Sequence, residues 1–212
     1  MMPSPDALVH ALKSRHAVKT FDPTRTVDEG IIDALIEVAR LSASSFGLQP
    51  YRLVVVQDRA ALAQLYEDGA KQPQVRDCSH LFILQARRHI DSAFIDAYIN
   101  LVAQTRAIAA EQLAGFRDAL LAGPGRDPAG REGMVWAQRQ CYTVLGHLLL
   151  AASLLGIDAS PMEGFTPAGV DAQLGNEATW TATVLLAVGY AAKDWTPPVK
   201  VRRPTEQFVV RL

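Results

Sequence analysis

Three basic side chains lie close together near the start of the chain, in the stretch SRHAVKTFD at residues 14–22. Arg15, His16 and Lys19 fall within five residues, directly after a short predicted helix. Guanidinium and ammonium groups bind carboxylates and phosphates through charge-assisted hydrogen bonds. The cluster is therefore either part of a solvated loop or one side of a site for an anion.

Two further polar stretches occur far from this cluster in the sequence. In SPMEGF, at residues 160–165, Pro161 and Gly164 lie on either side of Glu163, and Lys200 and Arg202 are two residues apart near the end of the chain. Side chains at positions i and i+2 of an extended segment point to the same side. A loop with accessible backbone N–H groups suits an aromatic ring, and basic clusters from opposite ends of the chain suit a phosphate. Each feature alone is compatible with an ordinary surface loop, but together they predict a site for an aromatic ligand that carries a phosphate.

The length and the charge of the chain limit the classes of protein to which it can belong. With 212 residues, 49% of them apolar, the chain can bury one large core, so a single domain over residues 1–212 is the simplest expectation. The formal net charge of −1 argues against nucleic acid and anionic membranes as partners, because both require a clear excess of Lys and Arg. The first residues, MMPSPDALVHALK, lack the basic and apolar segments of a secretory signal, and we expect a cytoplasmic protein.

Several common catalytic and metal-binding motifs are absent. The sequence contains no Gly-x-Gly-x-x-Gly after a strand, no Walker-type loop, no His-Glu-x-x-His and no Gly-x-Ser-x-Gly. No two of the five His residues are spaced to share a helical face, so we expect no metal site, and His147 is interpreted as a core histidine. Cys78 and Cys141 lie outside any C-x-x-C pair and are expected to be buried free thiols.

Hydrophobic periodicity and turn residues divide the chain into helices and strands. Ile31, Leu35, Val38 and Leu41 form one apolar stripe at helical spacing, and the YRLVVVQD stretch is typical of a buried strand. From such patterns we expect helices at 4–14, 28–44, 59–70, 91–121 and 134–157, and strands at 51–58, 80–86, 156–159 and 179–190. The loop at 122–132 is rich in Gly and Pro, as active-site flaps often are, and the tail at 191–212 is expected to be extended and to end in a β-prone segment.

The predicted helix at 134–157 is apolar on nearly all sides. This pattern is typical of a helix that is buried in a large core or at an interface between subunits. Its uninterrupted apolar run is too short to span a bilayer, and His147 interrupts it.

Five stretches of the chain, in their order and spacing, resemble the flavin-dependent nitroreductase family. They are SRHAVKTFD, LSASSFGLQPYRLVVV, KQPQVRDCSH, GIDASPMEGF and VKVRRP, and the resemblance covers about residues 8–204. It is closest to the branch of oxygen-insensitive NAD(P)H nitroreductases and dihydropteridine reductases. It implies an α+β fold in which a central, mostly antiparallel sheet is wrapped by helices, and an intertwined homodimer with an FMN at each of two sites in the subunit interface. It also implies that a C-terminal extension, about residues 191–212, wraps around the dimer.

The resemblance assigns roles around FMN to individual residues. Arg15, Lys200 and Arg202 correspond to ligands of the phosphate, with His16 at the same end, and Ala17 stands where relatives often have a serine. The other positions expected near the cofactor are Lys19 at the N1 and O2 edge of the flavin, Ser44, Ser45, Gln74, Pro161, Met162, Glu163, Gly164, and Lys71, which stands where relatives commonly have Asn; Phe46 and Phe116 are expected on the substrate side.

The implied reaction is the transfer of hydride from NAD(P)H through flavin N5 to a nitroaromatic, a quinone or a related conjugated acceptor, in a ping-pong sequence. Negative charge accumulates at N1 and O2 of the flavin as hydride arrives, so a cation there stabilises the transition state. The resemblance gives this role to Lys19, with Glu163 also assisting, and no other side chain is expected to be catalytic. Two alternatives remain open: another flavin enzyme of the same fold, such as a reductive dehalogenase or a flavin-fragmenting enzyme, and a non-catalytic flavin carrier.

Overall fold

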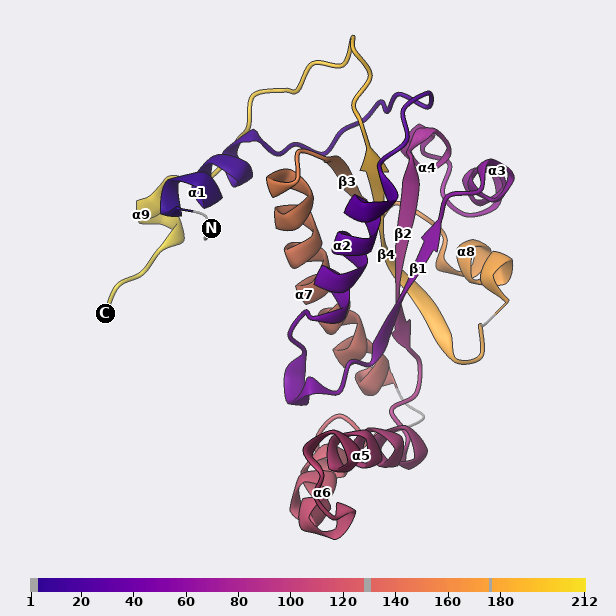
Figure 1. The fold of residues 1–212 in the computed structure, drawn as a ribbon, viewed down its shortest axis with the longest axis vertical. Coiled ribbons are helices and arrows are strands. Elements are labelled where there is room, and N and C mark those ends of the chain that lie inside the picture. The colour runs from indigo at the N-terminus through magenta and orange to yellow at the C-terminus, as the bar shows by residue number, and fades with distance from the viewer. Residues whose placement is uncertain (1–3, 128–130, 176) are drawn as a thin grey trace.

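The computed structural model describes residues 4–127, 131–175 and 177–212, which form an α+β fold (Figure 1). Its centre is an antiparallel sheet with the strand order β1-β2-β4-β3. The strands of this sheet are β1 (Tyr51–Val56), β2 (His80–Arg87), β3 (Asp158–Met162) and β4 (Trp180–Gly189). The expected fold class, with helices around a mostly antiparallel sheet, is confirmed.

Helices cover both faces of this sheet. Two helices, α2 (Glu29–Arg40) and α7 (Arg131–Leu154), pack on one face, and α3 (Arg59–Asp68) and α8 (Pro167–Leu174) lie on the other (Figure 1). The remaining helical elements are α1 (Pro5–Ser14), the 3-10 turn Ser45–Gly47, α4 (Pro73–Asp77), α5 (Ser92–Arg106), the 3-10 turn Ala110–Leu113, α6 (Ala114–Ala122) and α9 (Thr205–Phe208).

The hydrophobic core has two parts because successive strand residues point to opposite faces of the sheet. On β2, Phe82 and Leu84 belong to the cluster under α2 and α7, whereas Leu81 and Ile83 belong to the cluster under α3 and α8. All four side chains are fully buried or nearly so, and the sheet is covered on both sides.

Four helices begin at side chains of the type that commonly caps a helix. Ser4, Asp28, Asp58 and Asp91 each accept a hydrogen bond of 2.8 to 3.1 Å from a backbone N–H group in the first turn of α1, α2, α3 and α5. These bonds satisfy donors that have no partner inside the helix, so the local sequence fixes where each helix begins.

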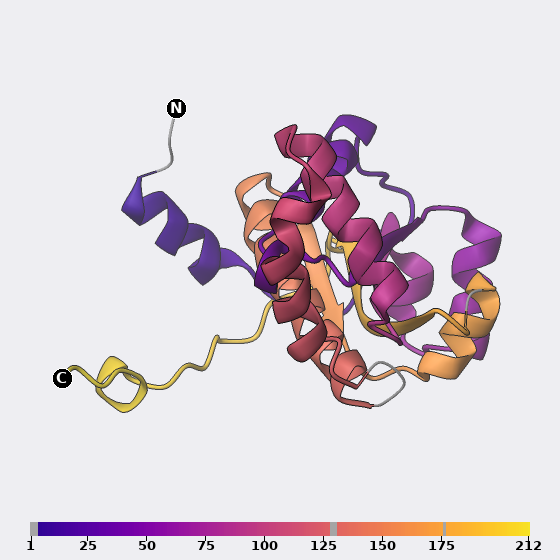
Figure 2. The same ribbon diagram turned by 90° about the horizontal axis from the view of Figure 1, so that it is seen from below.

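The first helix and the C-terminal tail project from the same side of the body (Figure 2). Ser153, near the end of α7, attaches α1 through a hydrogen bond of 2.7 Å from its Oγ to the backbone oxygen of Ala11. The tail leaves Val199, Val201 and Phe208 exposed by 92%, 82% and 78%. We call α1 and the tail at 191–212 the projecting unit; in a single chain it presents apolar side chains to solvent.

The two edge strands differ from the sequence expectations. Instead of residues 156–159, β3 comprises Asp158–Met162, so Pro161 and Met162 lie within the strand and not in the loop after it. Proline lacks the N–H group that a central strand needs, but β3 is at the edge of the sheet, where proline is tolerated. The other edge strand is β1, and all six of its residues are half-buried, so the expectation of a buried strand there is wrong.

The helices differ from expectation in several places. The helix expected at 28–44 ends at Arg40, and the tail, which was expected to be extended, contains the short helix α9. The helix expected at 91–121 is divided because Ala107 adopts a left-handed backbone conformation with a φ of 52°. The helices α4 and α8 were missed, although each begins with a proline, Pro73 or Pro167, which is a known signal for the first helical position. The β-prone end of the tail forms no strand within the described residues, because it has no neighbouring strand to pair with (Figure 1). Of the loop at 122–132, residues 128–130 lie outside the described residues.

The structure also tests the predictions made for His147, for the two cysteines and for the long apolar helix. The interpretation of His147 as a core histidine is wrong for the single chain, because its side chain is exposed, with Nδ1 3.0 Å from Ser42 Oγ. Cys78 and Cys141 are buried free thiols as expected, and burial raises the pKa of each to about 12. No helix in the described ranges, α7 included, is long and apolar enough to cross a membrane.

A buried carboxylate attaches α8 to the sheet. Asp171 is 1% exposed and accepts hydrogen bonds from Gln85 Nε2 (3.1 Å), the backbone N of Ala182 (2.7 Å) and Arg88 Nη2 (3.1 Å). Because three donors from β2, β4 and the chain after β2 converge on it, the carboxylate is fully paired.

We expect the variant Asp171→Ala to lose about 3 kcal/mol of unfolding free energy, because the change leaves buried donors unpaired. For a chain of this size the loss corresponds to a decrease in Tm of about 6–12 °C, measured by thermal unfolding. Asp118→Ala, an exposed aspartate of α6, is the matched control. Similar losses in the two variants would show that Asp171 is not an anchor.

Candidate functional site

The basic residues from the two ends of the chain meet beside the end of α1. Lys200 Nζ donates hydrogen bonds to the backbone oxygens of Leu12, at 2.7 Å, and of Arg15. Partial burial and then the charge of Arg202 lower the pKa of Arg15. Burial and then the charges of Arg15 and Arg202 lower the pKa of Lys200. Arg15, Lys200 and Arg202, here called the basic cluster, therefore repel one another, and a bound anion would relieve this repulsion.

One nitrogen of the basic cluster is unsatisfied. Arg15 Nη1 is buried and has no hydrogen-bond partner in the described part of the chain. Leaving a buried donor unpaired costs about 1–3 kcal/mol, so each such group needs an explanation. A phosphate oxygen would satisfy this donor and would also neutralise the cluster. The residues present therefore fit the phosphate end of the FMN that the sequence implies.

The segment that follows Arg15 lies beside β3. Ala17 and Ala159 form an isolated parallel bridge, in which Val18 N donates to the Ala159 oxygen at 3.4 Å. Lys19 is exposed, and the His16 ring is 6.4 Å from the Trp195 ring, centroid to centroid. The bridge therefore places the residues after α1 next to the strand that leads into Pro161–Gly164.

A hydrogen bond connects the Pro161–Gly164 stretch to the start of α4. Gln72 Nε2 donates to the Gly164 oxygen at 2.6 Å, and a Cβ at position 164 would lie only 3.0 Å from the same Nε2 atom. The two predicted residues on either side of Gln72 differ, because Gln74 is buried and Lys71 is exposed. Gln72 was not predicted, and only its place between Lys71 and Gln74 could have indicated it.

The side chain of Glu163 is held by the long helix. Tyr142, on α7, donates its hydroxyl to Glu163 Oε1 at 2.7 Å. Burial, followed by this hydrogen bond and the carboxylate charge, raises the pKa of Tyr142 to about 12. The phenol is therefore a stable donor at neutral pH, and it fixes the carboxylate beside the Pro161–Gly164 backbone. Tyr142 was not predicted, since a contact over 21 residues leaves no local pattern in the sequence.

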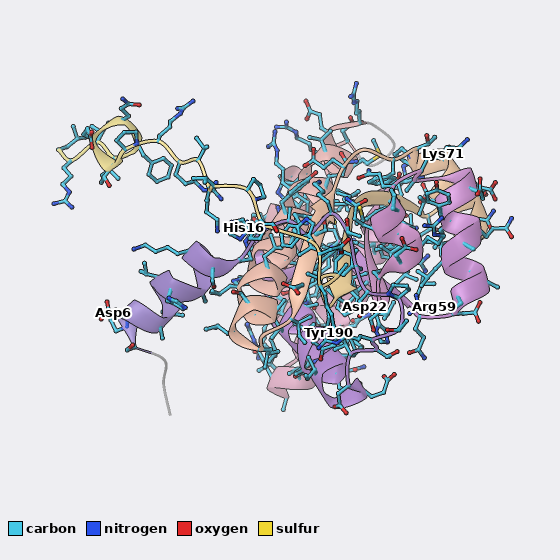
Figure 3. All side chains as sticks on the ribbon, turned by 90° about the horizontal axis from the view of Figure 1, so that it is seen from above. Asp6, His16, Asp22, Arg59, Lys71 and Tyr190 are labelled. Carbon is cyan, nitrogen blue, oxygen red and sulfur yellow. The ribbon has the colours of Figure 1, made fainter. Side chains whose placement is uncertain are left out.

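The predicted cofactor residues next to α1, β3 and α4 follow one broad surface, except for Gln74 and Met162, which are buried. Figure 3 shows His16 where α1 and the tail leave the body, and Lys71 at some distance from it, across the same end of the molecule. Neighbouring parts of this surface are connected by the Lys200, Ala17–Ala159 and Gln72–Gly164 contacts. We call these residues the first group; they are Arg15, His16, Ala17, Lys19, Lys71, Gln74, Pro161, Met162, Glu163, Gly164, Lys200 and Arg202.

The other predicted residues approach α7 from another side. Ser45 N donates to Gln140 Oε1 at 2.8 Å, and Ser44 Oγ accepts a hydrogen bond from Gln49 N at 3.1 Å. Positions 140 and 142 of a helix point in directions about 200° apart. Ser45 and Glu163, the partners of these two positions, therefore lie on different sides of α7, and a single chain does not bring the serines to the first group.

The two predicted substrate residues contact each other. The rings of Phe46 and Phe116 are 6.4 Å apart, and Tyr98 lies 6.2 Å from Phe116 and donates its hydroxyl to the Phe46 oxygen at 2.9 Å. Phe46 has a φ of 59°, which is unusual for a residue with a large side chain. We call Ser44, Ser45, Phe46 and Phe116 the second group. Tyr98, which fixes the backbone of this group, was missed because it lies within an ordinary helical pattern.

No three side chains of His, Cys, Asp or Glu come together in the described part of the chain in a way that could hold a metal ion.

Known proteins share this arrangement of a sheet wrapped by helices. Residues 12–190 match the profile described as the Nitroreductase family. The chain therefore belongs to the nitroreductase family.

Individual relatives agree with this assignment over almost the whole chain. A protein of Staphylococcus haemolyticus, provisionally named an NAD(P)H nitroreductase, is 31% identical to this chain, and the alignment covers 96% of each protein. The solved structure of a nitroreductase-like protein from Streptococcus mutans has a TM-score of 0.82 at 21% identity and covers 99% of this chain and 100% of its own. A protein from Exiguobacterium sibiricum that is provisionally named a nitroreductase, solved in complex with FMN, has a TM-score of 0.74 at 21% identity, and the alignment covers 100% of both chains.

Proposed function

We propose that this protein is an FMN-dependent NAD(P)H oxidoreductase that reduces flat, conjugated acceptors such as nitroaromatics or quinones. The observation that carries the proposal is the unpaired, buried Nη1 of Arg15 inside a cluster of three cations from both ends of the chain. Two relatives support it, since the Exiguobacterium structure contains FMN and the name of the Staphylococcus protein includes NAD(P)H.

When bound, FMN would supply the hydride chemistry that no side chain of the site offers. The basic cluster would hold its phosphate, and the Pro161–Gly164 backbone would support its ring. Lys19, whose exposed ammonium group is free to approach a ligand, would stabilise negative charge at one edge of the ring. Glu163 would assist by keeping this stretch in place through Tyr142. We also propose that reductant and acceptor occupy the same place in turn, which gives ping-pong kinetics.

We propose that the working unit is a homodimer. The first and second groups approach α7 from different sides, so a second copy is needed to place Ser44, Ser45 and Phe46 at the first group. A second copy would also cover the apolar side chains that the tail exposes. In this arrangement residues 1–212 form one domain, and the extension at 191–212 wraps around the partner.

The proposal is tested by mixing the purified protein with NADH or NADPH without oxygen. We expect a yellow protein whose flavin absorbance is lost on mixing and returns when a nitroaromatic or a quinone is added. A protein that is colourless and takes up no added FMN would refute the proposal. A flavin that neither reductant bleaches would indicate a carrier and not a reductase.

Arg202→Ala should weaken FMN binding by about 10-fold to 150-fold, because a charge-assisted hydrogen bond is worth about 1.5 to 3 kcal/mol. Riboflavin lacks the phosphate, so its affinity should change little. Fluorescence-quenching titrations with both ligands measure the difference. Arg203→Ala, the adjacent exposed arginine, is the matched control. Equal losses for FMN and riboflavin would show that the tail cations do not bind the phosphate.

Lys19→Ala should retain FMN but slow its reduction by NAD(P)H about 100-fold, or about 3 kcal/mol, which is typical of losing one electrostatic stabiliser. Stopped-flow absorbance measures the rate, and Lys13→Ala, another exposed lysine, is the control. If reduction is unchanged and binding fails, Lys19 is a phosphate ligand.

Phe208→Asp should weaken the dimer, since it puts a charge on the apolar tail that we propose to be covered. Analytical ultracentrifugation should detect monomer in this variant and little in Gln207→Asp, its exposed neighbour on α9. A wild-type protein that is a stable monomer with FMN bound would contradict the dimer.

A further inference from the structure

A cavity beside the second group combines aromatic walls with an excess of positive charge. It has a volume of about 550 Å³. Phe46 and Trp136 contribute rings to its lining, and glycine, proline and valine contribute apolar surface. The charged side chains of the lining are Arg126, Arg131, Arg139 and Glu132.

One face of α7 forms much of this lining. Glu132, Val135, Trp136 and Arg139 are separated by three or four residues, so they lie on the same side of the first turns of the helix. Arg139 is thus one turn away from the indole of Trp136. A ligand ring against Trp136 would place a substituent within reach of this guanidinium.

The positive charge of the cavity is only partly neutralised. Arg126 Nε donates to Glu132 Oε2 at 2.9 Å, and the two residues form an ion pair. Arg131 and Arg139 form no ion pair with any residue in the described part of the chain. Arg131 is also the first residue of α7, where the helix dipole adds positive potential. Two guanidinium groups therefore remain available to an anion.

Hydrogen bonds connect the cavity to the residues that we propose to reach the cofactor. Gln140 accepts from the backbone N of Ser45 at 2.8 Å and donates to the backbone oxygen of Trp136 at 3.2 Å. Phe46, the next residue after Ser45, lines the cavity itself. The volume is in the range that holds a molecule of one or two rings.

We propose that this cavity binds an acidic electron acceptor, a flat conjugated molecule whose ring packs against Phe46 and Trp136 and whose carboxylate meets Arg139, with Arg131 as a second cation. The inference rests on the proposed function, because it assigns the acceptor of the same site. It narrows the substrate class from conjugated acceptors in general to those that carry a carboxylate.

The test compares 4-nitrobenzoate with 4-nitrobenzamide, two acceptors of nearly equal shape that differ in charge. With the FMN-loaded protein and one reductant, KM and kcat are measured for each acceptor, and calorimetric titration of the oxidised protein gives each Kd without turnover. The variants are Arg139→Ala, Arg139→Lys and Glu132→Gln. Arg25→Ala removes an exposed arginine from the loop before α2, at the other end of the molecule from the start of α7 (Figure 1), and serves as the control.

We expect Arg139→Ala to raise KM and Kd for 4-nitrobenzoate by about fivefold or more and to leave the values for 4-nitrobenzamide nearly unchanged. Arg139→Lys should restore part of the affinity because it retains the charge. Glu132→Gln should strengthen 4-nitrobenzoate binding, since Glu132 is the one carboxylate among the lining residues that the structure describes. High salt should weaken only the binding of 4-nitrobenzoate.

Three results with Arg139→Ala would overturn the inference. The first two are equal changes in the KM and Kd of both acceptors, and no change for either acceptor. The third is a change in the preference for NADPH over NADH while the values for both acceptors stay the same, which would assign Arg139 to a phosphate of the dinucleotide. A wild-type protein whose flavin is bleached by neither NADH nor NADPH would contradict the proposed function, and the calorimetric Kd values would still decide whether the cavity prefers the carboxylate.

Discussion

The attachment of Lys200 to the end of α1, beside two other cations, is the interaction on which the arrangement of both chain ends depends. Lys200 binds the carbonyl oxygens of Leu12 and Arg15, at the end of α1, where a helix has unpaired acceptors and favours a positive charge. The same lysine therefore caps α1 and brings a second positive charge to Arg15. Because the tail is attached to α1 at this point, an anion that neutralises the cluster would also stabilise the attachment of the whole projecting unit.

The long helix α7 sets the second constraint. Its side chains Gln140 and Tyr142 hold loops that approach from different sides, so the helix both organises the two groups of site residues and keeps them apart. A cofactor that uses both groups needs two copies of the chain. The apolar tail that projects from the body is consistent with the same solution, since a second copy could bury it (Figure 2). FMN binding and dimer formation would then be coupled.

Local chemistry accounts for the parts of the fold that could be predicted. Caps such as Ser4 and Asp28 mark helix starts, and the continuous apolar run of β2 marks a strand that is buried on both faces. The break at Ala107 could not be predicted, because a residue with good helix propensity carries no sign of a left-handed conformation. The exposure of His147 was missed for another reason, since it depends on which side of α7 the sheet occupies.

The candidate site divides in the same way between local and distant information. Side-chain type and spacing were enough to bring Arg15, Lys200 and Arg202 to attention, because a cationic cluster is visible in the sequence itself. The residues that position the site, such as Tyr98 and Tyr142, act across 52 and 21 residues of sequence. A single sequence contains no pattern that links positions so far apart, so these contacts become visible only in the fold.

The loop that carries Phe46 shows why the acceptor side of the site can be selective. Phe46 and Gln49 both have left-handed backbone conformations, with φ of 59° and 47°, which cost about 1–3 kcal/mol each. The bonds of Tyr98 to the Phe46 oxygen and of Ser44 to Gln49 N hold this backbone in place. The backbone that carries the phenyl ring is therefore fixed before a ligand arrives, although the ring itself is 44% exposed, and little backbone entropy would be lost on binding. In the proposed site the aromatic side chains would select ligands by shape, whereas the exposed, flexible guanidinium of Arg139 would select them by charge over a range of positions. Shape and charge would then be selected by separate parts of one cavity.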